Sequence, residues 1–136
     1  MELLVVLAIM GLISTLAVSG IARTMPGFTL RNDVRLVADA LRAARTAAVG
    51  GNREVTLVLD LEQHTLTFDN QRPVRLDPDL GIALTTGTSE IADARTGGIS
   101  FFPDGTSTGG RVSLTLGERR QHVLVDWLTG TVSIVE

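Results

Sequence analysis

A long uncharged run near the start of the chain limits what this protein can fold into. After Met1 and Glu2, the residues from Leu3 to Ala22 include no charged side chain. A helix rises about 1.5 Å per residue, so this run would extend for roughly 30 Å, the thickness of the hydrocarbon core of a bilayer. A cleavable secretory signal has a basic start and an apolar core of about 7–15 residues, whereas the first charge here is acidic. The run therefore predicts a membrane-spanning helix.

Small residues recur three or four positions apart within this run: Ala8, Gly11, Thr15, Ser19 and Ala22. This spacing places them on one helical face, where small side chains let the backbones of neighbouring helices approach closely. Membrane helices are also generally rich in small residues. A helix-packing face at Gly11, Thr15 and Ser19 and an ordinary membrane-helix composition therefore both remain open.

The residues that follow the run are enough for one small domain. The net charge of -3 and the pI near 5.3 do not favour binding to nucleic acid or to anionic lipid. The chain has no cysteine, which excludes a disulfide framework, a thiol nucleophile and a thiolate metal site.

A kink or break is expected near Pro26, because proline removes a helical N–H and clashes with the preceding turn. A second helix is predicted to begin at Asn32 or Asp33, either of which is a good N-cap, and to run to about Val49. Gly50-Gly51 is expected to supply the left-handed residue that ends it.

This second helix is predicted to be amphipathic. Its apolar side has one stripe of Val34, Val37, Leu41, Ala44 and Ala48, and a second of Leu36, Ala40, Ala43 and Ala47. The opposite face carries Arg31, Arg35, Asp39 and Arg42. Arg35 and Asp39 are spaced as an i,i+4 pair, so a solvated face is favoured over a site for an anionic partner.

The rest of the chain has the alternation of short β-strands. Strands are expected at residues 54–60, 65–68, 74–76, 82–85, 99–102, 112–116, 122–126 and 131–135, with a turn-rich, mobile loop at residues 86–98. Strands at this spacing predict antiparallel sheets, with the second helix laid on one of them. The predicted fold is α+β: a long N-terminal helix, kinked near Pro26, on an antiparallel two-sheet β domain, divided into residues 1–50 and 51–136.

Few residues favour catalysis or metal binding. His64 and His122 have no second ligand at metal-binding spacing, and Asp77 and Asp79 flank a proline in a turn rather than a calcium loop. The glycine-rich stretch 104–110 lacks the lysine and the helix of a phosphate-binding loop. We therefore expect no enzyme, no metal site and no cofactor.

The order of residues from Glu2 to Leu12 resembles the N-terminal motif of type IV pilin-like proteins. By that resemblance Glu2 matches the motif glutamate, which is thought to pair with the N-terminal amine of an adjacent subunit. The resemblance also implies processing by a prepilin peptidase and methylation of the new N-terminus. The sequence departs from the pattern at Met1, where the family has an aliphatic residue.

Two further segments, residues 99–110 and 125–132, look like the C-terminal signature of the minor pseudopilin H family of type II secretion systems, together with Leu41–Arg45. Within them, tight turns are expected at Asp104-Gly105 and Thr129-Gly130, and Gly109-Gly110 is expected to free the backbone before a strand.

This second resemblance implies a structural subunit at or near the tip of a pseudopilus that helps to export folded proteins across the outer membrane. It implies a single-pass inner-membrane anchor, a periplasmic C-terminal domain and contacts with other minor pseudopilins, the major pseudopilin and the inner-membrane secretion platform. The alternative is a minor pilin of a type IV pilus that binds DNA during uptake. Because Arg119-Arg120 is the one basic doublet, nucleic acid is the less favoured partner.

Overall fold

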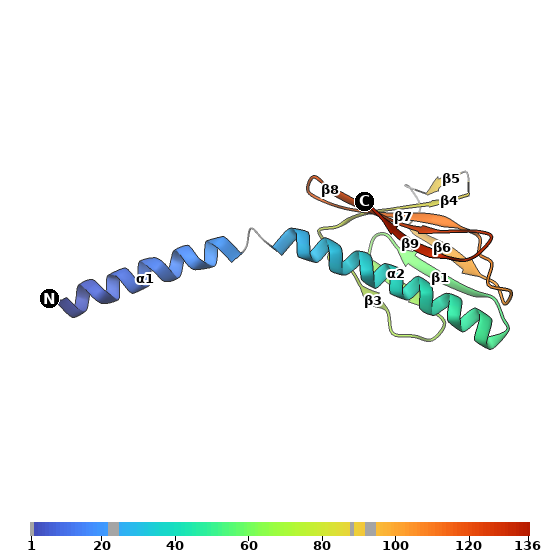
Figure 1. The fold of residues 1–136 in the computed structure, drawn as a ribbon, viewed down its shortest axis with the longest axis horizontal. Helices are drawn as coiled ribbons and strands as arrows, with labels where there is room; N and C mark the ends of the chain where they lie inside the picture. Colours follow the sequence, from blue (N-terminus) through green and yellow to red (C-terminus); the bar gives the residue numbers. More distant parts are fainter. Residues whose placement is uncertain (1, 22–24, 88, 92–94) are drawn as a thin grey trace.

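The computed structural model describes residues 2–21, 25–87, 89–91 and 95–136; the surroundings of side chains are described for residues 2–14, 27–87 and 95–136. Two helices, α1 (Glu2–Ile21) and α2 (Met25–Gly51), precede the strands (Figure 1). The strands are β1 (Val55–Asp60), β2 (Thr65–Phe68), β3 (Val74–Arg75), β4 (Gly81–Thr86), β5 (Ser89–Ile91), β6 (Thr96–Phe101), β7 (Gly110–Leu116), β8 (Arg119–Val125) and β9 (Val132–Val135).

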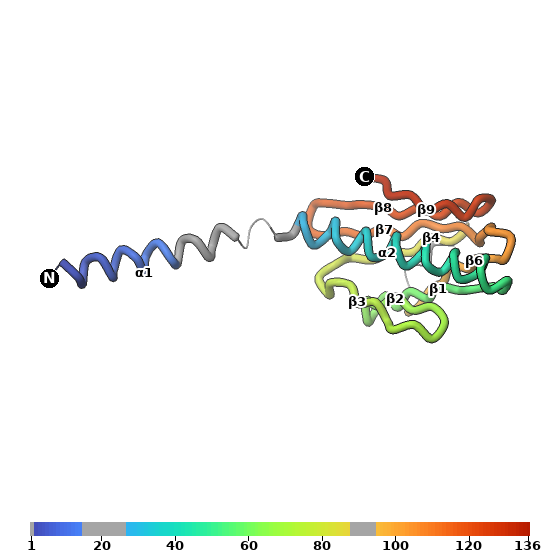
Figure 2. The backbone as a smooth tube through the Cα atoms, turned by 60° about the horizontal axis from the view of Figure 1, so that its bottom comes forward, coloured from blue at the N-terminus to red at the C-terminus, as the bar shows by residue number. Residues whose placement is uncertain are grey.

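The strands form two antiparallel sheets, with orders β3-β2-β1-β6 and β5-β4-β7-β8-β9. Helix α2 lies over them and contacts strands of both sheets (Figure 2). Together they form the head, whose apolar core is supplied by α2 and by the inward-facing residues of each sheet, with Leu41, Phe101, Leu114 and Val123 fully buried. The predicted α+β class and the two-sheet arrangement are confirmed.

Helix α1 projects away from the head (Figure 1). The predicted break near Pro26 falls partly on residues 22–24, which lie outside the described residues. Pro26 itself is the second residue of α2. A proline is tolerated in the first turn of a helix, because the N–H it lacks would have no intrahelical partner there.

The predicted start of the second helix is wrong. Helix α2 begins at Met25, not at Asn32 or Asp33. Leu30, which is 2% exposed, extends the buried stripe by one turn, and packing of this residue stabilises the earlier turns. Asp33 is buried and its Oδ2 accepts a hydrogen bond from the backbone N–H of Asp77 at 2.9 Å, so it ties α2 to a loop rather than capping the helix.

The predicted stop at Gly50-Gly51 is also wrong in detail, because the left-handed residue is Asn52, with φ of 49°. The N–H of Arg53 donates to the carbonyl of Ala48 at 3.2 Å, and that of Asn52 to the carbonyl of Val49 at 3.4 Å. This is a Schellman motif in which asparagine, the residue that most readily replaces glycine in the left-handed region, takes the glycine position.

The buried face of α2 differs in part from the predicted stripes. All five residues of the first stripe are buried, but Ala43 of the second is exposed, and Ala38, which belongs to neither, is fully buried. The buried face is broader than a two-stripe pattern because α2 covers both sheets. The predicted Arg35–Asp39 pair is replaced by Arg42 and Asp39, whose Nη1 and Oδ1 lie 3.3 Å apart.

The predicted loop at residues 86–98 is corrected by the sheet pairing. It contains β5, which pairs with β4, and the first three residues of β6, which pair with β1. Thr96 lies opposite Asp60, so pairing with the long strand β1 imposes strand geometry on a segment of low strand propensity. Residues 88 and 92–94 lie outside the described residues.

The start of strand β8 also differs from the prediction. This strand begins at Arg119, earlier than the predicted start at residue 122.

Candidate assembly surfaces

The first candidate surface is helix α1. Glu2 lies in its first turn, where a carboxylate interacts favourably with the positive end of the helix dipole. The large apolar side chains of its first half are exposed, from Val6 at 52% to Leu3 at 80%. Among the described residues, no helix has both the length and the hydropathy of a membrane span.

The small-residue face of α1 is described only in part. A Cβ added at Gly11 would have no neighbouring atom within 4 Å, so this position is open to an approaching helix. The side chains of Thr15 and Ser19 lie outside the described residues. Nearby, Leu4, Val5, Ala8, Ile9 and Leu12 line a shallow apolar groove of about 440 Å³. Burial of such a surface against another apolar helix or lipid would stabilise an assembly in proportion to the area covered.

A second feature is a junction at the end of the head farthest from α1. Here helix α2 meets the turn at Asp104-Gly105 and the turn at Thr129-Gly130. Arg45, on α2, donates from Nε to the carbonyl of Gly105 at 3.3 Å and from Nη2 to the carbonyl of Thr129 at 3.1 Å. Gly130 packs so closely that a Cβ there would lie 2.1 Å from the carbonyl oxygen of Gly105. These three segments are distant in sequence, and Arg45 holds them together.

Each turn of this junction is closed by an aspartate. Asp104 Oδ1 accepts hydrogen bonds from the hydroxyl of Thr106 at 2.6 Å and from its N–H at 3.0 Å, and these bonds lower the pKa of Asp104. Asp126 Oδ1 accepts from the N–H groups of Thr129 at 2.9 Å and Leu128 at 2.8 Å, which lower the pKa of Asp126. Gly105 and Gly130 have φ of 87° and 66°, which other residues adopt only with strain.

Ser107 connects the same two turns from inside the head. This serine is 6% exposed; its Oγ donates to the carbonyl of Asp126 at 2.8 Å and accepts from the N–H of Gly109 at 3.0 Å. At Gly109 a Cβ would lie 3.0 Å from Cβ of Trp127, and at Gly110 it would lie 3.0 Å from the carbonyl oxygen of Thr85. Gly109-Gly110 thus lets the chain pass closely between a loop and strand β4.

Sequence reasoning identified the turn residues but gave no role to Arg45 or Ser107. Arg45 lies inside the Leu41–Arg45 segment that carries the family resemblance. The available signal for Arg45 was its position at the edge of the predicted apolar face of the helix, from which a long side chain can reach other elements. Nothing in the sequence distinguished Ser107 from its hydroxyl-bearing neighbours Thr106 and Thr108.

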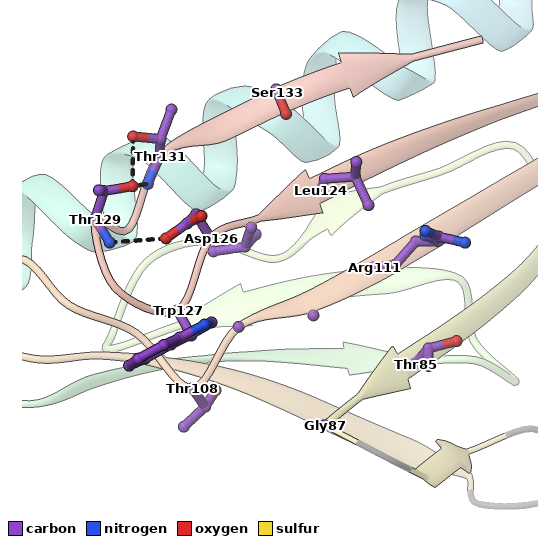
Figure 3. A pocket seen from close by; sticks show the side chains of 13 residues that line it. Thr85, Gly87, Thr108, Arg111, Leu124, Asp126, Trp127, Thr129, Thr131 and Ser133 are labelled. Carbon is purple, nitrogen blue, oxygen red and sulfur yellow. Dashed lines mark hydrogen bonds between the residues drawn. The ribbon is translucent and has the colours of Figure 1, made fainter.

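A third surface is a groove of about 810 Å³ on the outer side of the second sheet (Figure 3). Thr85, Arg111, Leu124 and Ser133 lie opposite one another on four adjacent strands and form its floor. Trp127, which is 65% exposed, stands at one end. The exposed Trp127 and Leu128 form an apolar tip on the turn of the β8–β9 hairpin.

The candidate metal and catalytic residues lie apart and have structural partners. His64 Nε2 is 3.0 Å from the carbonyl oxygen of Leu80, and His122 Nδ1 is 2.8 Å from Ser113 Oγ. Asp77 Oδ1 accepts from the N–H of Asp79 at 2.8 Å, which forms a turn. Within the described ranges, no group of three or more potential ligands is placed to hold a metal ion.

The sequence is similar to a known protein family and to one of its members. Residues 33–130 match the family described as type II transport protein GspH. A protein of Xanthomonas campestris pv. campestris, named type II secretion system protein H, is 33% identical over 97% of this chain and 78% of its own length.

Solved structures also resemble the fold. The minor pseudopilin EpsH from the type II secretion system of Vibrio cholerae matches with a TM-score of 0.62 at 14% identity, over 79% of this chain and 93% of that one. The type IV minor pilin FimU of Pseudomonas aeruginosa matches with a TM-score of 0.57 at 12% identity, over 79% and 88% of the two chains. Since both identities are low, these likenesses bear on the fold alone.

Proposed function

The chain belongs to the type II transport protein GspH family, and we propose that it acts as a minor pseudopilin near the tip of a type II secretion pseudopilus, where it aids the export of folded proteins across the outer membrane. The observation that carries this is the combination of an exposed apolar helix with a pilin-like head. In this role the head supplies contacts rather than catalysis.

Helix α1 has two successive tasks in this proposal. It first anchors the chain in the inner membrane, with the head in the periplasm, and later packs against the corresponding helices of neighbouring subunits. Its exposed apolar side chains support both tasks, because lipid tails and a helical filament core are similarly apolar environments. Cleavage by a prepilin peptidase and methylation of the new N-terminus belong to the same proposal.

Glu2 is assigned to subunit recognition. A carboxylate at the edge of hydrocarbon is costly unless it has a partner, and the N-terminal amine of an adjacent subunit would supply one. The face with Gly11, Thr15 and Ser19 is assigned to close packing between helices. The expected partners are other minor pseudopilins, the major pseudopilin and the inner-membrane secretion platform.

A deletion of the gene in its native host, complemented with the full chain, tests the proposal against the alternative of a DNA-uptake pilin. We expect type II substrates to accumulate in the periplasm of the deletion strain and to return to the medium on complementation, with DNA uptake unchanged. Normal secretion together with impaired DNA uptake would contradict the proposal and favour the alternative. The similarity to FimU supports the alternative only at the level of the fold.

A further inference from the structure

The end of the head that adjoins α1 brings together the β7–β8 turn and the first turns of α2 (Figure 1). A shallow groove of about 220 Å³ lies between them, lined by Gly27, Leu30, Arg31, Arg119, Arg120 and Glu136. These elements are far apart in sequence, so the concentration of arginines here is a property of the fold.

The arginines are held at the surface. The Arg119 guanidinium lies across Gly27 so closely that a Cβ at that position would be 2.2 Å from Nη1, and the missing side chain therefore makes room for it. Arg31 and Arg120 are exposed. In the part of the chain that the structure describes, no ion pair joins these three arginines to an acid.

Two acids lie near this cluster. Glu118 is exposed in the β7–β8 turn, and Glu136 Oε1 lies 3.5 Å from Gln121 Nε2. Three arginine side chains lie here beside two glutamate side chains, whereas acidic side chains outnumber basic ones by 15 to 12 in the whole chain. The charge of the whole chain therefore does not reveal this cluster.

An exposed aromatic ring lies beside the cations. Phe28, on the first turn of α2, is 78% exposed and precedes Arg31 by three positions, so both lie on neighbouring parts of one helix face. Exposed phenylalanine next to arginine is the composition of segments that lie in the headgroup region of a bilayer.

We propose that this end of the head, which we call the basal surface and define by Phe28, Arg31, Arg119 and Arg120, binds the anionic phospholipid headgroups of the membrane in which α1 is anchored. The inference rests on the proposed anchoring of α1. Guanidinium groups match phosphate oxygens in charge and bidentate geometry, and the phenylalanine ring enters the acyl boundary. The attraction acts within about 10 Å at 0.1 M salt, so the proposal requires the anchored α1 to bring the basal surface that close to the headgroups.

The full chain in lipid nanodiscs provides the test. It has no cysteine, so a single nitroxide can be attached at Asn32→Cys, next to the basal surface, or at Leu128→Cys on the opposite end of the head. Nanodiscs contain either phosphatidylcholine alone or phosphatidylcholine with phosphatidylglycerol, each with a nickel-chelating lipid that enhances nitroxide relaxation near headgroups. We expect enhancement at position 32 and not at 128, strongest with phosphatidylglycerol and reduced by salt.

The double variant Arg119→Gln/Arg120→Gln is compared with Arg72→Gln/Arg75→Gln, which removes the same charge from exposed sites elsewhere on the head. Two arginines near an anionic surface change the ratio of docked to free heads by about thirtyfold. The first variant should therefore lose the enhancement at position 32 and the second should keep it.

Three outcomes would overturn the proposal. Failure of the full chain to float with vesicles of either composition would also contradict the anchoring of α1. Flotation with equal enhancement at positions 32 and 128 would contradict the basal surface alone. Enhancement at position 32 that is equal with and without phosphatidylglycerol would also contradict it. Immobilisation of that label on addition of the major pseudopilin would then assign the surface to protein contacts.

Discussion

At the residue scale, Gly130 has no room for a side chain. It combines φ of 66° with a Cβ position only 2.1 Å from the carbonyl oxygen of Gly105. The change Gly130→Ala therefore adds a steric clash to backbone strain, and we expect a loss of about 2–4 kcal/mol in the free energy of unfolding. Urea denaturation of the full chain in detergent, followed by the fluorescence of Trp127, measures it.

Gly117→Ala is the matched control for this variant. Gly117 has a similar φ of 61°, but a Cβ there meets no atom within 4 Å. Strain alone should cost about 1–2 kcal/mol. Equal losses in the two variants would show that the junction around Arg45 tolerates the extra methyl group.

Asp126 makes the stability of the head depend on pH. Its pKa is lowered in the folded state by the N–H groups of Thr129 and Leu128. A depressed pKa contributes stability that is present above the unfolded value of about 3.9 and lost as the pH falls through the lower folded value. Asp126→Asn should therefore be less stable than the parent chain at pH 7, and the difference in stability should shrink as the pH falls below the unfolded value. A difference in stability between the two chains that stays the same in acid would contradict this role of the Asp126 carboxylate.

Glu2 is expected to act in assembly and not in folding or insertion. Because its proposed partner is the amine of another subunit, Glu2→Ala should leave the protein in the membrane fraction and its thermal unfolding unchanged, while the amount in sheared pseudopili falls severalfold. Glu2→Asp, which keeps the charge, is the matched control. Normal incorporation of Glu2→Ala would remove the proposed role.

Individual residues of the head were only partly predictable. Asp104 and Asp126 precede glycines at turn spacing, and such turn chemistry is local. Arg45, Ser107 and Asp33 act through partners 19 to 84 positions away, and contacts of that range follow from the sheet topology rather than from neighbouring residues. The left-handed Asn52 was missed because two glycines precede it and favour an earlier stop.

At the element scale, Gly11 tests whether α1 packs through its small-residue face. Apart from the adjacent residues and backbone of α1 itself, a Cβ at this position meets no atom within 4 Å, so Gly11→Leu should leave the unfolding of the head unchanged. A bulky side chain on a packing face separates helices, so incorporation into pseudopili should fall. Met10→Leu, on an adjacent exposed position, is the control. Normal assembly of Gly11→Leu would contradict the packing face.

The elements themselves followed the sequence closely where hydrophobic periodicity was regular. The five buried residues of the first α2 stripe and strand β1 were predicted because a period near four and a period of two are both local patterns. Strand β5 and the beginning of β6 form in a polar, glycine-containing stretch through pairing with β4 and β1. Pairing of this kind depends on distant partners, and no local pattern encodes it.

At the scale of the whole molecule, the chain has two parts with opposite surface chemistry. The head buries its apolar side chains between α2 and two sheets, whereas α1 exposes those of residues 3–13. An exposed apolar helix is stable in water only when another surface covers it. In the proposed cycle, lipid covers α1 first and neighbouring α1 helices cover it in the pseudopilus, while the head retains its structure in both states.

Disulfide crosslinking in the native secretion system tests this account most directly. The chain has no cysteine of its own, so Ile9→Cys on α1 can be paired with a cysteine at the matching position of the major pseudopilin, with Leu128→Cys as the control. We expect a crosslink through position 9 that requires an active secretion ATPase, and none through position 128. Secretion that continues without any crosslink through α1 would contradict the account.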